Sequence, residues 1–408
     1  MVCPAQGTIF IFPPGGKCGS PYALFHPNSR SGILMNDLFQ NRKLHGTHLG
    51  DILLDWFARH QRDLPWRRTY TPYHVWISEI MLQQTQMDRG VQYFQRWIQH
   101  FPDIRSMALA SEDEILKHWE GLGYYSRARN LHRAAQILCH DNNCELPREI
   151  QQLLRLPGIG PYTARAIASI AFEQDVCVVD ANVERLMSRI FNLKNPVKSR
   201  QTQLQINALC EEILPPGRAR AFNQAAMEFG SLVCVPRKPA CGSCPVAGLC
   251  EARLLGVEEE RPVGAKPVQP IYLSMSTGVL IHEGRILVQK RQPDDVWANL
   301  WEFPGGLVEE GETPAQAVIR EFMEETRLRV VAPEPIALFK HAYTRYRVTL
   351  NAFFVQLCSD PTDIVLHAAQ EYRWSSWKEL QALAFPAGHR KLIAHLNDDP
   401  RFQARVHP

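Results

Sequence analysis

The chain has 408 residues, more than one hydrophobic core usually supports, so two or three domains are expected. Its net charge of +3 is small, and any surface that binds nucleic acid must therefore be local. No charged leader precedes an apolar stretch, which excludes a signal peptide, and no apolar run is long enough to span a membrane. We therefore expect a protein of a reducing compartment, in which clustered cysteines bind metal rather than form disulfides.

The pattern of residue types changes along the chain. Residues 1–34 are rich in Pro, Gly and Ser, which predicts a disordered or mis-assigned start. Residues 49–252 carry apolar side chains three or four positions apart, as amphipathic helices do. Three prolines among charges in residues 253–270 predict a linker. Short β-type runs, a helix and further strands follow. The sequence thus predicts an all-α domain (35–252) followed by an α+β domain (271–400).

Glu79 lies in a helical run, 75–84, whose neighbouring side chains are almost all apolar. An exposed Glu on an amphipathic helix is the ordinary alternative, but this helix has little polar surface. Burial would raise the pKa of the carboxyl group and leave it protonated near neutral pH. Glu79 is therefore a candidate general acid.

A glycine turn, 156–161 (LPGIGP), separates two helical runs. Its backbone amides and the next helix N-terminus could hold a DNA phosphate, although an ordinary interhelical turn is the alternative. Further along, Asp180 precedes a helix and can cap it. An ionised carboxylate there could also stabilise a cationic sugar transition state. Glu79 and Asp180 would then match the acid and stabiliser of N-glycosidic cleavage.

Four cysteines follow the pattern C-x6-C-x2-C-x5-C: Cys234, Cys241, Cys244 and Cys250. Four thiolates on a short segment suit an iron-sulfur cluster or a structural zinc. The cluster is favoured because zinc usually takes two C-x-x-C pairs and only one is present, and disulfides are the third alternative. A cluster here would order the loop so that Arg237 and Lys238 face phosphate.

In order along the chain, these motifs resemble the MutY family of helix-hairpin-helix adenine DNA glycosylases. The resemblance rests on 64–67 (LPWR), 73–86 (YHVWISEIMLQQTQ), 121–131 (GLGYYSRARNL), the hairpin, Asp180 and the four cysteines. It implies a six-helix barrel (72–178) inserted in a helical domain that holds a 4Fe-4S cluster. It also implies a monomeric, cytoplasmic bacterial enzyme, acting with the nucleoid, that removes adenine mispaired with 8-oxoguanine or guanine from duplex DNA in base excision repair.

The resemblance also assigns residues. Glu79 would protonate the adenine, Asp180 would stabilise the sugar cation, and Gln84 and Tyr124 would fill the gap left by the extruded base. Tyr162 stands where the bifunctional endonuclease III branch carries a Schiff-base lysine, which predicts a glycosylase without lyase chemistry. The other candidate DNA contacts are Gly158, Gly160, Asn182, Arg127 and Arg129, of which the two arginines could instead form a solvated face. A non-catalytic iron-sulfur DNA-binding protein is the alternative, which Glu79 disfavours.

The C-terminal domain resembles the Nudix (MutT-related) fold, with a nearly whole Nudix box in which Arg327 replaces the final glycine. Glu321, Glu324 and Glu325 fall on one helix face and could hold magnesium against a diphosphate, although such carboxylates are usually only solvated. An additional nucleotide pyrophosphohydrolase activity is therefore an alternative. Thr344 and Arg345 stand where relatives carry Ser and His in the loop that recognises the lesion. This predicts relaxed discrimination between 8-oxoguanine and guanine, with Arg345 able to contact guanine O6 and N7.

Overall fold

The computed structural model describes residues 48–264 and 269–406. The predicted disordered start, 1–34, and part of the predicted linker lie outside the described residues. Within the described ranges, no helix is both long and apolar enough to cross a lipid bilayer.

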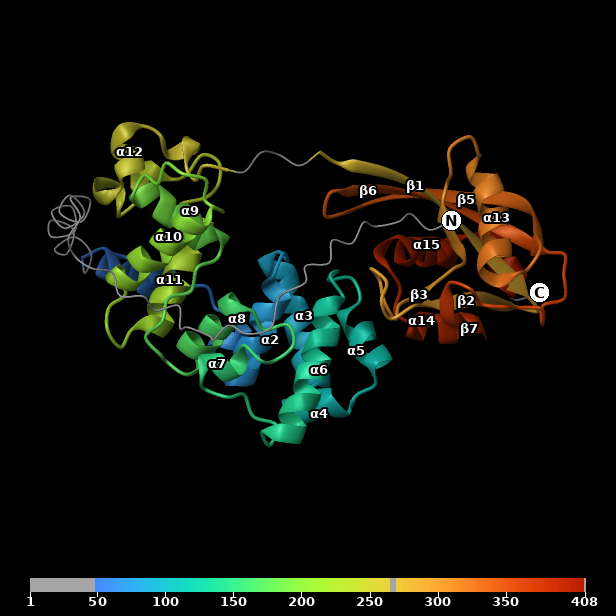
Figure 1. Cartoon of the computed structure of the whole chain (residues 1–408), viewed down its shortest axis with the longest axis horizontal. Coiled ribbons are helices and arrows are strands. Elements are labelled where there is room, and N and C mark those ends of the chain that lie inside the picture. Colours follow the sequence, from blue (N-terminus) through green and yellow to red (C-terminus); the bar gives the residue numbers. More distant parts are fainter. Residues whose placement is uncertain (1–47, 265–268, 407–408) are drawn as a thin grey trace, which may run out of the picture. The chain divides into compact units, whose positions relative to one another are not determined.

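Residues 48–264 are helical (Figure 1). Its elements are a helix over 48–60, η1 (Pro65–Arg67), α2 (Pro72–Leu82), α3 (Met87–His100), α4 (Ile104–Leu109), α5 (Glu112–Trp119), α6 (Ser126–Asp141), α7 (Ile150–Leu153), α8 (Pro161–Ala166), the π-helix η2 (Ile167–Ala171), α9 (Ala181–Ile190), α10 (Arg200–Ile213), α11 (Ala219–Leu232), η3 (Cys241–Ser243), η4 (Ala247–Leu249), α12 (Glu251–Leu255) and η5 (Glu258–Glu260). The predicted helical texture of this region is confirmed.

The helical region has two main hydrophobic cores. One lies among α2 to α8 and contains Trp76, Trp97 and Trp119, all fully buried. The other packs Leu53, from the first helix, against Met187 of α9 and Phe229 of α11. The segment that builds the first core is therefore inserted between the two parts that build the second.

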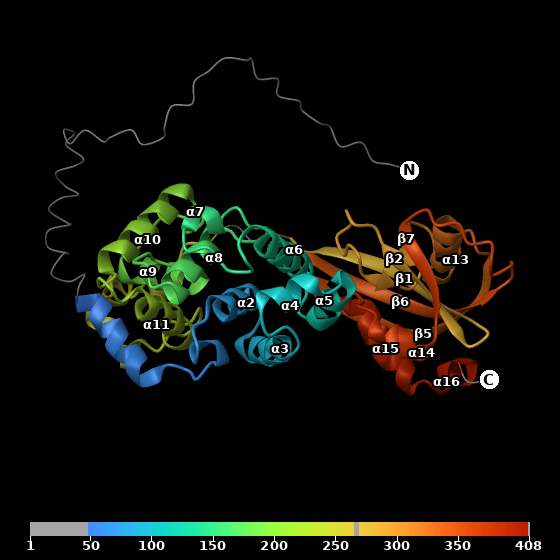
Figure 2. The same cartoon turned by 90° about the horizontal axis from the view of Figure 1, so that it is seen from below.

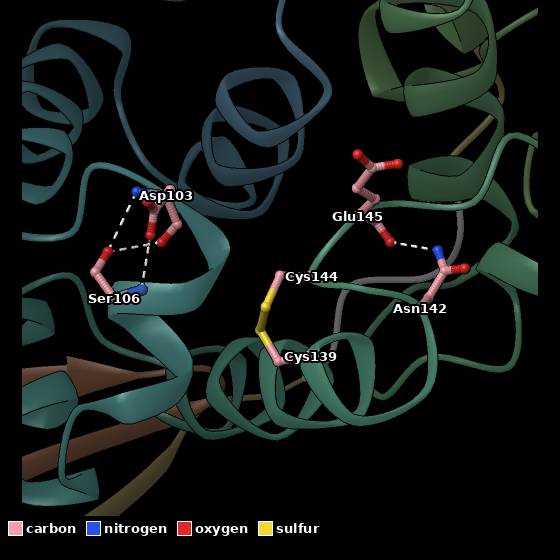
Figure 3. Close-up of a disulfide and its surroundings, with 6 residues drawn as sticks. All are labelled: Asp103, Ser106, Cys139, Asn142, Cys144 and Glu145. Carbon is pink, nitrogen blue, oxygen red and sulfur yellow. Dashed lines mark hydrogen bonds between the residues drawn. A yellow bond between two sulfur atoms is a disulfide. The ribbon is translucent and has the colours of Figure 1, made fainter.

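A disulfide joins Cys139, near the end of α6, to Cys144 in the following turn (Figure 3). Asn143 and Cys144 both have left-handed backbones, which turn the chain back so that the two Cα atoms lie 3.8 Å apart. The turn is also held by the Asn142 side chain, which donates to the Glu145 carbonyl at 2.6 Å. This pair departs from the expectation that the cysteines of this chain would not form disulfides.

The C-terminal region forms a seven-stranded mixed sheet within the described residues (Figure 2). Its elements are β1 (Ile271–His282), β2 (Arg285–Arg291), β3 (Trp301–Glu302), β4 (Gly305–Leu307), α13 (Pro314–Thr326), β5 (Val330–Tyr343), β6 (Tyr346–Leu357), β7 (Ala369–Ser375), α14 (Trp377–Ala382), α15 (Ala387–Asp398) and α16 (Pro400–Val406). The strand order is β3-β2-β1-β6-β5, with β4 beside β1 and β7 beside β2, and only the β1–β6 pairing is parallel among those described.

Helices pack on both faces of this sheet, against side chains that alternate along its strands. Val279 packs with Leu392 of α15 and Phe402 of α16, whereas its neighbour Leu280 packs with Phe322 of α13. The two-residue period of a strand places successive side chains on opposite faces. The sheet therefore lies between α13 and the C-terminal helices, and the predicted α+β class is confirmed.

Two turns in this region contain residues from the motifs of the C-terminal domain. Arg327, in place of the last glycine of the Nudix box, adopts a left-handed backbone with φ of 60° and ends α13. An arginine thus takes the conformation that glycine adopts most easily at this position. The tip of the β5–β6 hairpin consists of Thr344, also left-handed, and Arg345, and both side chains are exposed.

Candidate active site

A cavity of about 680 Å³ lies among α2, α8, α9 and α11. It brings together residues separated by more than a hundred positions in the sequence. Its polar lining includes Gln84, Glu79, Tyr162, Asp180 and Asn182, all of them predicted site residues. The polar residues that sequence reasoning missed include Arg62, Arg67, Glu184, Lys198, Gln224 and Glu228.

Glu79 is buried on α2, and the Tyr162 hydroxyl of α8 donates a hydrogen bond to its Oε2 at 2.8 Å. Burial raises the pKa of Glu79 to about 7, an effect that the Tyr162 hydrogen bond opposes and the nearby Asp180 reinforces. The expected rise of this pKa is confirmed. A carboxyl group with a pKa near 7 can both hold and release a proton at neutral pH.

Asp180 caps α9. One carboxylate oxygen accepts from the Val183 backbone amide at 2.8 Å and the other from the Asn182 side chain at 2.7 Å. Burial raises the pKa of Asp180, whereas these hydrogen bonds oppose the rise. Asn182 in turn accepts a hydrogen bond from Arg185 at 2.9 Å. Asn182 therefore holds the Asp180 carboxylate in place.

The missed charged residues form ion pairs in the cavity wall around two carboxylates, Glu228 and Glu184. Arg67 donates to the carboxylate of Glu228, which is 1% exposed and also accepts from the Arg62 backbone amide. Lys198 contacts both oxygens of Glu184 at 2.8 Å. Arg67 and Glu228 are far apart in the sequence, and nothing in the sequence around Glu184 and Lys198 marks them as site residues. Only Arg67 belongs to a motif, LPWR, that the sequence already offered.

Gln84 lies just after α2, and Tyr124 lies between α5 and α6. Both have left-handed backbones, with φ of 57° and 49°. Gln84 is exposed at the rim of the cavity, and Tyr124 is half-buried. Such conformations are uncommon for residues other than glycine and persist where the surroundings impose them. The structure thus presents each side chain from a fixed turn.

The predicted phosphate contact of Arg127 is corrected. Its guanidinium is turned inward and donates to five backbone carbonyls, so it is occupied within the protein. Arg129 is half-buried, and it donates to the Ala298 carbonyl at 2.8 Å.

The glycine hairpin has the predicted form. Gly158 is exposed with φ of 77°, and a Cβ there would lie 2.7 Å from Asn130, so only glycine fits. Gly160, also exposed, is the N-cap of α8, with Pro161 as the first helical residue. Gly158 and Gly160 are therefore exposed in this turn, whereas the Ile159 amide donates to the Leu156 carbonyl at 3.2 Å.

The four cysteines line one cavity: Cys234 follows α11, Cys241 begins η3, Cys244 follows η3, and Cys250 precedes α12. Arg189, 1% exposed, donates to the Cys234 sulfur at 3.3 Å and to the Val235 carbonyl at 2.7 Å. A buried cation that donates to a sulfur offsets the negative charge of thiolates that ligate iron. The residues present therefore fit an iron-sulfur cluster.

The carboxylates of the Nudix box gather beside β4. Arg320 donates to Glu321 at 3.0 Å and to Glu324 at 2.9 Å, and it also pairs with Glu312. Glu325 accepts from the Gly305 amide at 2.9 Å, and burial raises its pKa to about 8. Carboxylate oxygens are the ligands that magnesium prefers, but here Arg320 and the Gly305 amide already pair with these oxygens.

Three family models match the chain. The model of the HhH-GPD superfamily base excision DNA repair proteins matches residues 77–216, the iron-sulfur binding domain of endonuclease III matches residues 234–250, and the NUDIX domain matches residues 276–395. The second match contains all four cysteines of the cavity.

The chain is also similar to known proteins over most of its length. The adenine DNA glycosylase of Homo sapiens is 32% identical over 400 residues, covering 84% of this chain and 72% of that protein. The adenine DNA glycosylase of Buchnera aphidicola subsp. Acyrthosiphon pisum is 31% identical over 308 residues, covering 75% and 86%. Among solved structures, a thermostable thymine-DNA glycosylase is 28% identical with a TM-score of 0.49, covering 53% of this chain and 99% of that chain.

Proposed function

Because the chain belongs to the adenine DNA glycosylase family and is a DNA N-glycosylase of base excision repair, we propose that it removes adenine mispaired with 8-oxoguanine or guanine. It acts on duplex DNA as a monomer. The observation that carries this proposal is the Tyr162–Glu79 hydrogen bond in the same cavity as Asp180.

In this mechanism the extruded adenine enters the cavity, and Glu79 donates its proton to the base. Because the Tyr162 hydroxyl donates to Oε2 of Glu79, we assign the acidic proton of Glu79 to Oε1. Protonation lets the bond between C1′ and N9 break with its electron pair on the adenine. Asp180 stabilises the cation left on the sugar, and water completes the hydrolysis.

The cavity supports glycosylase chemistry without a lyase step. Tyr162 occupies the position at which a lysine would form a Schiff base, and burial raises its pKa well above 10, so it stays protonated. Lys198 also lines the cavity, but its ammonium group is held by both oxygens of Glu184. The Lys198 nitrogen is occupied by that ion pair and is not placed to attack the sugar.

The surfaces for DNA follow from the exposed turns. Gln84 and Tyr124 fill the space of the extruded base, and Gly158 and Gly160 present backbone amides to phosphate. Thr344 and Arg345 at the β5–β6 tip contact the base opposite the adenine. With arginine there, we expect 8-oxoguanine to be preferred over guanine only weakly.

The chain carries an iron-sulfur site in residues 234–250, and we propose that the four cysteines hold a 4Fe-4S cluster. The cluster supplies a fixed junction between α11 and α12 and takes no part in base removal. Arg185 connects this junction to the active site, because it donates to the Cys234 carbonyl at 2.7 Å and also holds Asn182.

Glu79→Gln tests the acid assignment. The amide cannot donate a carboxyl proton, so adenine release is expected to fall by at least about 100-fold, while duplex affinity is retained. Adenine release is measured in single turnover on duplexes with adenine opposite 8-oxoguanine, guanine and cytosine. Glu145→Gln, at an exposed glutamate, is the matched control. Persistent release by Glu79→Gln would show that another group is the acid.

A second candidate activity resides in the Nudix-like domain, where Glu321, Glu324 and Glu325 would hold magnesium and polarise a nucleoside diphosphate linkage. The convergence of these groups around Arg320 and Gly305 favours it. The test is release of pyrophosphate from 8-oxo-dGTP with magnesium. We expect turnover that Glu324→Gln reduces by about tenfold or more, and equal turnover in the variant would rule the activity out.

A further inference from the structure

Arg127 is the second residue of α6, and its guanidinium lies where two turns meet. One terminal nitrogen donates to three carbonyls at the end of α2, and the other donates to two carbonyls of the 121–124 turn. The accepting oxygens are those of Ile80 (2.7 Å), Met81 (3.3 Å), Gln83 (2.6 Å), Leu122 (3.3 Å) and Gly123 (3.1 Å).

The carbonyls at the end of α2 need such a partner, whereas the Gly123 carbonyl also accepts from the Trp119 indole at 3.0 Å. The last carbonyls of a helix have no intrahelical donor and carry partial negative charge. The 121–124 turn has left-handed backbones at Gly121, Gly123 and Tyr124 and belongs to no helix or strand. The guanidinium also lies over the Trp119 ring at 5.1 Å and the Tyr124 ring at 5.6 Å. One partly buried cation therefore joins the end of α2 to the 121–124 turn.

Two of the carbonyls that Arg127 binds directly precede the predicted wedge residues. Gln84 follows Gln83, and Tyr124 follows Gly123, each in a left-handed conformation. The next turn of α6 contributes Asn130, which packs against Gly158 of the hairpin. The start of α6 thus supports all three exposed turns proposed to contact DNA.

We propose that Arg127 is a positioning residue that fixes Gln84 and Tyr124 relative to each other, so that both enter the duplex together. It makes no phosphate contact. This inference rests on the proposed function, which supplies the wedge role of these two side chains.

The experiment separates positioning from phosphate binding. Arg127→Met, which keeps much of the side-chain volume but no charge, is compared with wild type and with Arg133→Met, an exposed arginine on the same helix. Three quantities are measured on full-length protein with intact iron content. They are the salt dependence of duplex affinity, the fluorescence gain of 2-aminopurine opposite 8-oxoguanine on binding, and the single-turnover rate of adenine release.

For Arg127→Met we expect an unchanged salt dependence, a lost fluorescence gain, and a rate that falls roughly 10- to 100-fold, the usual effect of misplacing groups by about 1 Å. Arg127→Lys should recover part of the gain, because an ammonium group can still donate to the α2 carbonyls. Arg133→Met should match wild type. If Arg127→Met does not fold, Arg127→Lys carries the same comparison.

Two outcomes would overturn the inference. A salt slope that falls by about 0.9 would identify Arg127 as a phosphate contact after all, and an unchanged fluorescence gain would show that it does not position the wedge. Wild-type protein that unstacks 2-aminopurine but releases no adenine would instead refute the proposed function and leave the role of Arg127 standing.

Discussion

Burial mainly sets the pKa of Glu79, and one neighbouring hydroxyl lowers it. Its pKa of about 7 results from burial, which raises it, and from the Tyr162 hydrogen bond, which lowers it. Glu79 must be protonated to act as an acid, so adenine release should decline as the pH rises through about 7. Below that, activity persists until Asp180, whose own pKa is raised above 3.8, takes up a proton.

Tyr162→Phe should move the alkaline limb of the pH profile to higher pH. Removal of the hydroxyl removes the interaction that favours ionised Glu79, so its pKa rises further. The measurement is the single-turnover rate of adenine release between about pH 5 and pH 9. A limb that stays in place, or moves to lower pH, would contradict the assignment of Glu79 as the titrating acid.

At the scale of elements, α9 and α11 approach each other closely beside Asp180. Gly230 of α11 faces Asn182, and a Cβ there would lie 2.8 Å from the Asn182 Cβ and 2.9 Å from its carbonyl oxygen. Real Cβ atoms do not tolerate such distances to backbone. The glycine therefore allows the N-terminus of α9 to reach the cavity wall.

Gly230→Ala should push this N-terminus away and weaken both folding and catalysis. Alanine favours a helix by about 0.5–1 kcal/mol over glycine, but overpacking against backbone costs about 1–3 kcal/mol, so a net loss of unfolding free energy is expected. Chemical denaturation and adenine release measure the two effects. Gly264→Ala, where a Cβ meets nothing within 4 Å, is the control. A variant as stable and active as wild type would contradict the tight packing.

At the scale of the whole molecule, a net charge of +3 provides little general attraction to DNA. Affinity must come from local groups, and the cluster loop exposes Arg237 and Lys238 side by side. Lys238 has a left-handed backbone, and its amide donates to Glu259 at 3.3 Å, so the loop is held in place.

The double variant Arg237→Ala, Lys238→Ala should weaken duplex binding without loss of iron. Each lost phosphate contact reduces the slope of log affinity against log salt by about 0.9, and two contacts reduce it by about twice that. Anisotropy titrations at several salt concentrations measure the slope, and metal analysis checks the cluster. An unchanged slope would place the DNA elsewhere on the helical region.

The sequence by itself determined the features that depend on local pattern. Helical periodicity, the strand alternation after residue 270 and the spacing of Cys234 to Cys250 reflect which side chains share a face or a short loop. The burial of Glu79 also followed from its apolar neighbours. Only the tertiary structure decided the contacts between distant segments, such as Tyr162 with Glu79, Arg67 with Glu228, and the inward turn of Arg127. A side chain's partner and direction depend on how helices pack, and local periodicity does not encode that packing.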